Sequence, residues 1–190
     1  SGSERIVRFA YDYARSHKRN KVTTVHKANI LKYTGGLFLE VARQIAKEYP
    51  EIQSEDKIID NMAMQMVVNP NQFDVIVTTN LFGDILSDLA SGLVGGLGLA
   101  AGANVGFNAA LFEAVHGSAP DIAGKNIANP SAIILAGVMM LRHLNEHTAA
   151  DRIEQAVAAV IKEGRSVTRD LNPGASVGTV EMGEAILKRL

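Results

Sequence analysis

A run of β-branched residues that leads directly into a carboxylate-bearing, amphipathic segment is the feature that most restricts the fold. The run is Phe73–Thr79 (FDVIVTT), and Asn80–Asp88 (NLFGDILSD) follows it at once. A run of this kind is typical of a strand in the middle of a sheet, and sites in α/β proteins gather where such strands end. The sequence therefore predicts a strand, then a helix, with functional groups between them.

Two aspartates in this segment, Asp84 and Asp88, are four residues apart. In a helix this spacing places both carboxylates on one face, where they can bind a single divalent cation. Aspartate near a helix start also caps backbone N–H groups and complements the helix dipole. The spacing alone leaves both interpretations open.

The rest of the chain alternates between helical and strand-like patterns, which predicts a mixed α/β architecture. We expect Gly35–Gly36 to break the chain before a helix over Leu37–Tyr49, and a polar loop to lead to Lys57. The apolar run Met62–Val68 would then complete a helical hairpin, whose apolar face is either core or a dimer interface. Further helices are predicted over Glu4–Arg19, Ala132–Leu141, Asn145–Gly164 and Thr179–Leu190, and strands over Lys21–His26 and Leu111–Val115.

Composition excludes several functional classes. The chain has 190 residues, 47% of them hydrophobic, a formal net charge of -1 and no cysteine. The near-neutral charge argues against a nucleic-acid partner, and the absence of cysteine excludes disulfides and thiolate chemistry. No signal peptide or membrane-spanning run is visible, so we expect a cytoplasmic protein, or a mitochondrial matrix protein if a targeting segment was lost upstream of Ser1.

The glycine-rich stretch Leu89–Gly106 does not match a dinucleotide-binding fingerprint. Gly96 and Gly98 are followed by Gly102 rather than by a glycine three positions on, and a predicted helix, not a strand, precedes them. We therefore expect no Rossmann fold, and interpret the stretch as a helix end that runs into a loop.

Four blocks, in order, carry a family resemblance: Val25–Lys32, Ile59–Asn61, Asn80–Asp88, and His116–Gly124 with Asn129–Pro130. The chain resembles the carboxyl-terminal portion of the β-decarboxylating dehydrogenases, which include isocitrate, homoisocitrate and 3-isopropylmalate dehydrogenases. The resemblance implies a two-lobed, isopropylmalate-dehydrogenase-like α/β fold whose amino-terminal part is missing. Residues 1–72 would belong to a smaller dimerisation lobe, and residues 73–190 to a larger lobe with the metal and NAD sites.

The resemblance also implies catalytic roles. Asp84 and Asp88 would hold Mg²⁺ or Mn²⁺, and Asp60 would reach the same cation from the partner subunit of a homodimer. Lys27 would be the catalytic lysine, also acting from the partner, as a base or proton relay at the substrate hydroxyl. Asn29 would contact substrate and the nicotinamide, on the same side of an extended segment as Lys27.

A nucleotide site is implied by the loop after Val115. His116 would pack against adenine, Gly117 and Ala119 would let the backbone approach, and Asn129 would read the adenine edge. Ile122 belongs with the neighbouring Asp121, as the pair of residues that indicates which nucleotide binds. Asp121 would accept hydrogen bonds from the ribose hydroxyls and repel a 2′-phosphate, which predicts NAD rather than NADP.

The resulting functional hypothesis is oxidative decarboxylation of isocitrate to 2-oxoglutarate with NAD as hydride acceptor. The sequence motif His26–Asn29 favours isocitrate as the substrate. The motifs Thr78–Leu81 and Gly95–Leu99 also suit homoisocitrate, and 3-isopropylmalate is a further alternative. A non-catalytic regulatory subunit is the hypothesis of a different class; retention of Lys27 and of the three aspartates argues against it. The arginines that clamp the substrate and the catalytic tyrosine lie in the missing portion, so we expect this chain to be an incomplete enzyme.

Overall fold

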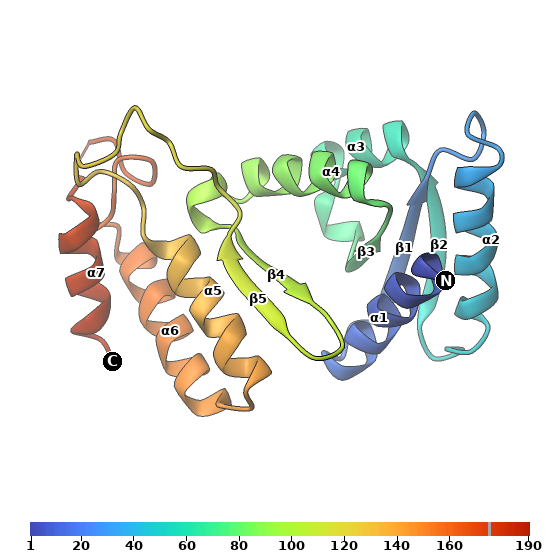
Figure 1. The fold of residues 1–190 in the computed structure, drawn as a ribbon. Coiled ribbons are helices and arrows are strands. Elements are labelled where there is room, and N and C mark those ends of the chain that lie inside the picture. The colour runs from blue at the N-terminus through green and yellow to red at the C-terminus, as the bar shows by residue number, and fades with distance from the viewer. Residues whose placement is uncertain (175) are drawn as a thin grey trace. The chain divides into compact units, whose positions relative to one another are not determined.

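The computed structural model describes residues 1–174 and 176–190. These residues form two compact units, Ser1–Ala90 and Ser91–Leu190, which are considered one at a time. Helices and strands alternate in the first unit, whereas the second contains one hairpin and three α-helices that follow it (Figure 1). The predicted α/β class is confirmed.

The first unit is built on a parallel sheet of three strands in the order β2-β1-β3. Parallel strands require crossover connections, and helices supply them here. The elements are α1 (Gly2–Ser16), β1 (Lys21–His26), α2 (Thr34–Ala46), β2 (Gln53–Ile58), α3 (Ile59–Val68), η1 (Pro70–Gln72), β3 (Val75–Val77) and α4 (Asn80–Leu93).

Both faces of this sheet are covered by helices. Successive side chains of a strand point to opposite sides, so β1 contributes to a core on each face. Val22 of β1 belongs to a core formed with α1 and α2, where Tyr11 and Phe38 are buried. Val25 of the same strand belongs to a second core, formed with α3 and α4 around Met62. The central strand β1 is therefore fixed on both sides, and so is the position of the residues that follow it.

Three features of the first unit differ from expectation. The predicted polar loop before Lys57 is strand β2, whose register with β1 runs from Lys21↔Gln53 to His26↔Ile58. The Gly35–Gly36 pair lies inside the first turn of α2 rather than before it. The compact unit also extends past Gln72 to Ala90, because β3 pairs with β1 in parallel.

The second unit consists of a β-hairpin covered by helices. Strands β4 and β5 pair antiparallel with Ala103 opposite Phe112, and α5 packs on them. A core of apolar residues, including Val157 and Met182, joins α6 and α7 to α5. The elements are η2 (Leu97–Leu99), β4 (Ala101–Val105), β5 (Ala110–Ala114), α5 (Ser131–His143), α6 (His147–Glu163) and α7 (Thr179–Leu187).

Strand β4 corrects the interpretation of Leu89–Gly106 as a helix followed by a loop. Glycine disfavours an isolated strand, but pairing with β5 supplies the hydrogen bonds that Ala101–Val105 lacks on its own. Gly102 also lies close to Val115: a Cβ added there would be 3.3 Å from the Val115 side chain. The glycine thus permits the hairpin to close.

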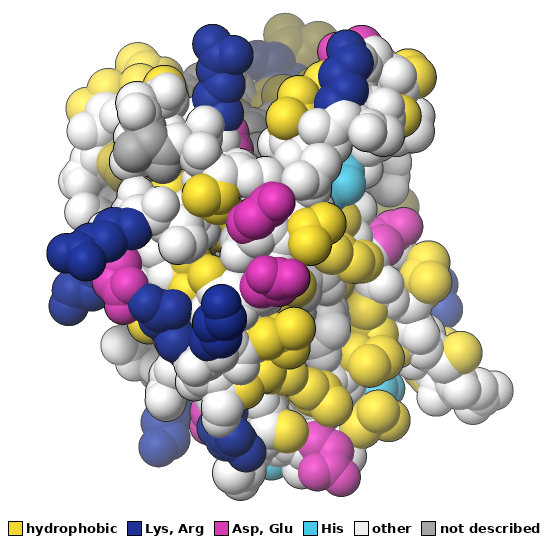
Figure 2. Space-filling model, turned by 90° about the vertical axis from the view of Figure 1, so that its left-hand side faces the viewer, with side chains coloured by type: hydrophobic (Ala, Val, Ile, Leu, Met, Phe, Trp, Pro, Cys, Tyr) yellow, Lys and Arg dark blue, Asp and Glu magenta, His cyan; other side chains and the backbone are white. Residues whose placement is uncertain are grey.

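The surface agrees with the composition. Among the described residues, no helix is both long enough and apolar enough to cross a membrane. On the face of the second unit seen in Figure 2, Lys and Arg side chains lie among acidic and hydrophobic ones and form no continuous basic stripe.

Candidate active site

The carboxyl ends of the three parallel strands meet at one edge of the sheet. Lys27 follows β1, Asp60 follows β2 after Ile59, and Asn80 follows β3 after two threonines. The register His26↔Ile58 aligns the first two exits, and Thr78 Oγ1 donates a hydrogen bond to the carbonyl of Val25 (2.8 Å), which ties the third exit to β1. The first unit therefore gathers the predicted catalytic residues at this edge.

Lys27 and Asp60 form an ion pair, with 3.1 Å between Lys27 Nζ and Asp60 Oδ2. The lysine side chain is 25% exposed, and the aspartate side chain is 70% exposed. The pKa of Asp60 lies below its usual value, mainly because the carboxylate accepts a hydrogen bond from Lys27. Desolvation opposes this shift, and backbone N–H groups at the start of α3 add to it. Asp60 is thus an anion at neutral pH, available to a cation on its exposed side.

Asp84 and Asp88 lie one turn apart in the middle of α4, and both are exposed. The Asn80 amide donates to Asp84 Oδ2 (3.3 Å), but among the described residues neither carboxylate has a salt-bridge partner. Like charges at this spacing repel each other, and a cation between them removes the repulsion. Two free carboxylates with a side-chain amide nearby suit Mg²⁺ or Mn²⁺, which prefer oxygen ligands.

Among the described residues, no third carboxylate or imidazole is grouped with Asp84 and Asp88. Across the part of the chain that the structure describes, no three His, Asp or Glu side chains are grouped so that they could hold a metal ion. Asp60 is accordingly not grouped with Asp84 and Asp88. The predicted contribution of Asp60 from a partner subunit stays a prediction.

The segment after Lys27 corrects one expectation. Residues 28–30 form a turn rather than an extended segment, because the N–H groups of Ile30 and Leu31 both donate to the Lys27 carbonyl (3.1 and 2.8 Å). Alternation along a strand therefore does not set the direction of Asn29. Asn29 is exposed at the same edge as Lys27.

The predicted nucleotide loop begins after β5 in the second unit. His116, Gly117, Ala119 and Asp121 are exposed, and Ile122 is partly buried. Ala119 has a φ of +41°, in the left-handed region that few non-glycine residues adopt, and its carbonyl accepts a hydrogen bond from Ile122 N–H (3.0 Å). The turn leaves this backbone open to a ligand.

Asn129 connects the end of the loop to two other segments. Its Oδ1 accepts from the N–H of Ser131 (2.9 Å) at the start of α5, and its Nδ2 donates to Asp170 Oδ2 (2.9 Å). A Cβ on Gly98 would lie 3.0 Å from Asn129 Cβ and 3.2 Å from Asp170 Oδ2, so only glycine fits there without a shift. No local pattern in the sequence indicates the contact with Asp170, which is 41 residues from its partner.

A second contact that sequence reasoning missed holds the same loop to α7. The carbonyl and the Oδ1 of Asn126 accept from the N–H groups of Thr179 and Val180 (both 3.0 Å), and its Nδ2 donates to Glu181 Oε2 (3.1 Å). Gly178, the N-cap of α7, has no side chain to do this. Asn126 thus caps the helix from another part of the chain.

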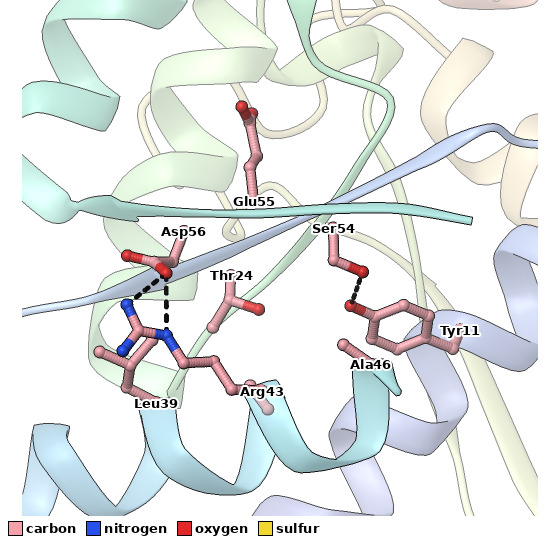
Figure 3. A pocket seen from close by; sticks show the side chains of 9 residues that line it. Tyr11, Thr24, Leu39, Arg43, Ala46, Ser54, Glu55 and Asp56 are labelled. Carbon is pink, nitrogen blue, oxygen red and sulfur yellow. Dashed lines mark hydrogen bonds and ion pairs between the residues drawn. The ribbon is translucent and has the colours of Figure 1, made fainter. Parts of the chain in front are cut away.

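One cavity, of about 280 Å³, lies between α2 and the sheet of the first unit. Its polar groups already have partners: Tyr11 OH donates to Ser54 Oγ (2.7 Å), and Arg43 donates to Asp56 Oδ1 from Nε and Nη2 (3.1 and 2.7 Å) (Figure 3). We therefore assign it no ligand. The strand edge with Lys27, and the loop after β5, are the candidate sites.

The candidate site has features of α/β enzymes with a cation site. It lies at the carboxyl ends of parallel strands and contains a lysine–aspartate ion pair and two neighbouring carboxylates without salt-bridge partners among the described residues. The family model described as Isocitrate/isopropylmalate dehydrogenase matches residues 1–186. The chain belongs to this family.

Individual relatives differ in the activity that they are named for. The chain is 54% identical over 169 residues to "Probable isocitrate dehydrogenase [NAD] subunit alpha, mitochondrial" of Drosophila melanogaster, covering 89% of this chain and 45% of that protein. It is 55% identical over 188 residues to a 3-isopropylmalate dehydrogenase of Archaeoglobus fulgidus, covering 99% and 57%. A relative named for NADP, an isocitrate dehydrogenase of Thermus thermophilus, also matches at 52% identity over 192 residues (100% and 38%).

Solved structures agree with the fold. The crystal structure of isocitrate dehydrogenase from Methylococcus capsulatus matches with a TM-score of 0.98 and 67% identity, over 99% of this chain and 56% of that one. The chain thus has the α/β fold of isocitrate dehydrogenase structures. It spans about half the length of the relatives that it matches.

Proposed function

We propose that the full-length protein containing this chain is an NAD-dependent, metal-dependent isocitrate dehydrogenase, which converts isocitrate to 2-oxoglutarate and carbon dioxide. The observation that carries the proposal is the Lys27–Asp60 pair, 3.1 Å apart, at the same strand edge from which the Asp84/Asp88 helix begins. Isocitrate is favoured over other 2-hydroxy acids because the matching structure at 67% identity is an isocitrate dehydrogenase.

The chain's own residues supply proton transfer. Oxidation removes a proton from the substrate hydroxyl and a hydride from its carbon, and loss of carbon dioxide leaves an enolate that must be protonated. Lys27, which pairs with Asp60, would relay the hydroxyl proton and return a proton to the enolate carbon. Asn29, exposed at the same edge, is assigned to substrate and nicotinamide contact.

Asp84 and Asp88 would hold Mg²⁺ or Mn²⁺ with Asp60 of a second subunit. When bound, the cation supplies a Lewis acid for the substrate oxygens. Apolar side chains on the exposed sides of α3 and α4 suit such a homodimer: Met64, Val67 and Val68 are 53%, 58% and 71% exposed. Met62 and Met66 of the same run are buried, so it contributes both to the core and to an exposed apolar surface.

The loop after β5 would bind NAD. His116 offers an imidazole face to adenine, the turn of Gly117, Ala119 and Ile122 offers backbone, and the Asn129 amide has a second N–H beyond the one given to Asp170. Asp170 adds an acceptor beside it for an amino group. Asp121 is exposed and supplies the charge that discriminates against a 2′-phosphate.

A second candidate function is oxidation of 3-isopropylmalate, because a relative of that name matches as closely as the NAD isocitrate dehydrogenase subunit does. Homoisocitrate is a third substrate within the same chemistry. A regulatory subunit that binds nucleotide without turnover is the alternative of a different class. The cytoplasm or the mitochondrial matrix is the proposed compartment.

The proposal is tested by assaying the full-length protein with Mn²⁺ and each pairing of isocitrate, homoisocitrate or 3-isopropylmalate with NAD or NADP. We expect the highest kcat/KM for isocitrate with NAD, by about tenfold or more over the other pairings. A preference for 3-isopropylmalate would overturn the substrate assignment. Binding of NAD without turnover of any acid would favour the regulatory subunit.

A further inference from the structure

The residue directly before Lys27 is a histidine that is almost fully buried. His26 ends β1, and its side chain is 6% exposed. Along β1 it shares a face with Val22 and Thr24, the face that α1 and α2 cover. A buried imidazole at this position requires partners for both ring nitrogens.

The hydrogen bonds of His26 determine its tautomer. The N–H of Ala28 lies 3.0 Å from Nδ1, so Nδ1 must accept and the ring proton must be on Nε2. Nε2–H then donates to Asp56 Oδ2 (3.3 Å). The other oxygen of Asp56 accepts two bonds from Arg43, which reaches across from α2 (Figure 3). A continuous chain of hydrogen bonds thus joins Arg43 and Asp56 to the Ala28 N–H.

The Ala28 N–H belongs to the peptide that links Lys27 to Ala28. The same peptide meets Gly35 on another side: a Cβ on Gly35 would lie 3.1 Å from Ala28 N and 3.2 Å from the Lys27 carbonyl carbon. The carbonyl of that peptide accepts from Ile30 and Leu31 N–H. Every polar atom of the peptide that begins the lysine turn is therefore held by named contacts.

We propose that His26 is a positioning residue for Lys27: its Nδ1 fixes the Lys27–Ala28 peptide, and Asp56 with Arg43 keeps the imidazole in the accepting tautomer. This inference rests on the proposed function, in which Lys27 relays the substrate proton. Rate depends steeply on the placement of such a group, and loss of a supporting hydrogen bond of this kind typically costs about 10- to 100-fold.

Two substitutions test the roles of the two ring nitrogens of His26 one at a time. In His26→Asn the amide oxygen can occupy the place of Nδ1 and accept from Ala28, while contact with Asp56 is lost. In His26→Gln the amide reaches toward Asp56 from the place of Nε2, and Ala28 N–H loses its acceptor. In the full-length protein we expect His26→Gln to lower kcat about 10- to 100-fold with the KM for NAD within about threefold, and His26→Asn to stay within about threefold of wild type in kcat.

A second pair of variants disturbs the same peptide without touching the histidine. Gly35→Ala places a methyl group against the Lys27–Ala28 peptide, whereas an added Cβ at the adjacent Gly36 meets nothing within 4 Å. We expect Gly35→Ala to lower kcat and Gly36→Ala not to, with thermal unfolding recorded for all four variants.

Equal loss of kcat in His26→Asn and His26→Gln, or no loss in either, would overturn the inference. Equal kcat values for Gly35→Ala and Gly36→Ala would also overturn the inference. This comparison serves as the test if a His26 variant fails to fold. Failure of the proposed function is distinguishable, because the wild-type protein would then lack dehydrogenase turnover altogether.

Discussion

The charge on Asp121 is the single-residue feature on which the proposed choice of NAD rests. Its carboxylate is exposed in a turn whose backbone is open. Two unit charges about 4 Å apart interact by about 1 kcal/mol in water and about 4 kcal/mol near a protein surface, which is enough to discriminate between NAD and NADP.

Removal of this charge should therefore change cofactor preference. We expect Asp121→Asn to raise kcat/KM with NADP relative to NAD by about tenfold, since about 1.4 kcal/mol corresponds to that factor. Glu184→Gln, on the exposed side of α7, removes the same charge elsewhere in the second unit and should leave the ratio unchanged. Steady-state kinetics with both nucleotides measures the ratio of kcat/KM with NADP to kcat/KM with NAD. An unchanged ratio in Asp121→Asn would refute the NAD assignment.

Ionisation of Asp56 makes the stability of the fold depend on pH. Burial opposes its ionisation most strongly of any single effect, but hydrogen bonds from Arg43 and His26 and the charge of Arg43 together lower the pKa of Asp56 below its ordinary value of 3.8. The unfolded chain then binds a proton more readily than the folded chain does, so the stabilisation is present above about pH 4 and is lost as the pH falls below it. We expect the thermal midpoint to fall more steeply below pH 4 in wild type than in Asp56→Asn; parallel curves would contradict this.

At the scale of elements, a loop and a helix depend on each other. Asn126 caps α7 with its carbonyl and side chain, and Gly178 must lack a Cβ because that atom would lie 2.2 Å from Asn126 Nδ2 and 2.7 Å from its carbonyl oxygen. The proposed nucleotide loop is thereby held by α7 through Asn126.

Substitution of Gly178 should consequently weaken nucleotide binding. We expect Gly178→Ala to displace the loop, raise the KM for NAD several-fold and lower the thermal midpoint, because a cap worth about 1 kcal/mol is lost. Gly183→Ala in the middle of α7, where an added Cβ meets nothing within 4 Å, should instead stabilise the helix slightly. An unchanged KM for NAD in Gly178→Ala would show that the loop does not need this anchor.

The elements that the sequence predicted are those whose local pattern is strong. The β-branched strands β1 and β3 and the amphipathic helices appear close to their expected bounds. Strand β2 was missed because it is an edge strand whose Gln53 and Ser54 are exposed, so its polarity resembles a loop. Strand β4 was missed because its stability comes from pairing with β5 rather than from its own residues.

The same distinction applies to the site. The lysine and aspartates were recognisable because each lies in a short motif at a strand exit. Asp170 and Asn126 were not, because their contacts join residues 41 and 55 positions apart, respectively. The extended segment expected at Asn29 is instead a turn, closed by bonds to the Lys27 carbonyl, which alternation in the sequence does not indicate.

At the scale of the whole molecule, the proposed active site requires two subunits. Within one chain, Lys27 pairs with Asp60, but the described residues hold no group of three potential metal ligands that includes Asp84 and Asp88. The proposed homodimer completes each site by joining the Lys27–Asp60 pair of one subunit to the aspartate pair of the other.

Complementation between inactive variants of the full-length protein tests this claim most directly. Lys27→Met and Asp88→Asn should each lower kcat by about 100-fold or more as homodimers, with the fold retained. Co-expressed in equal amounts with different tags, they form heterodimers in which one site carries both substitutions and the other carries neither. We predict recovery to about a quarter of wild-type activity in the mixture and about half in purified heterodimers. Heterodimers as inactive as the two parents would contradict the account, because Lys27 and Asp88 would then act within one subunit.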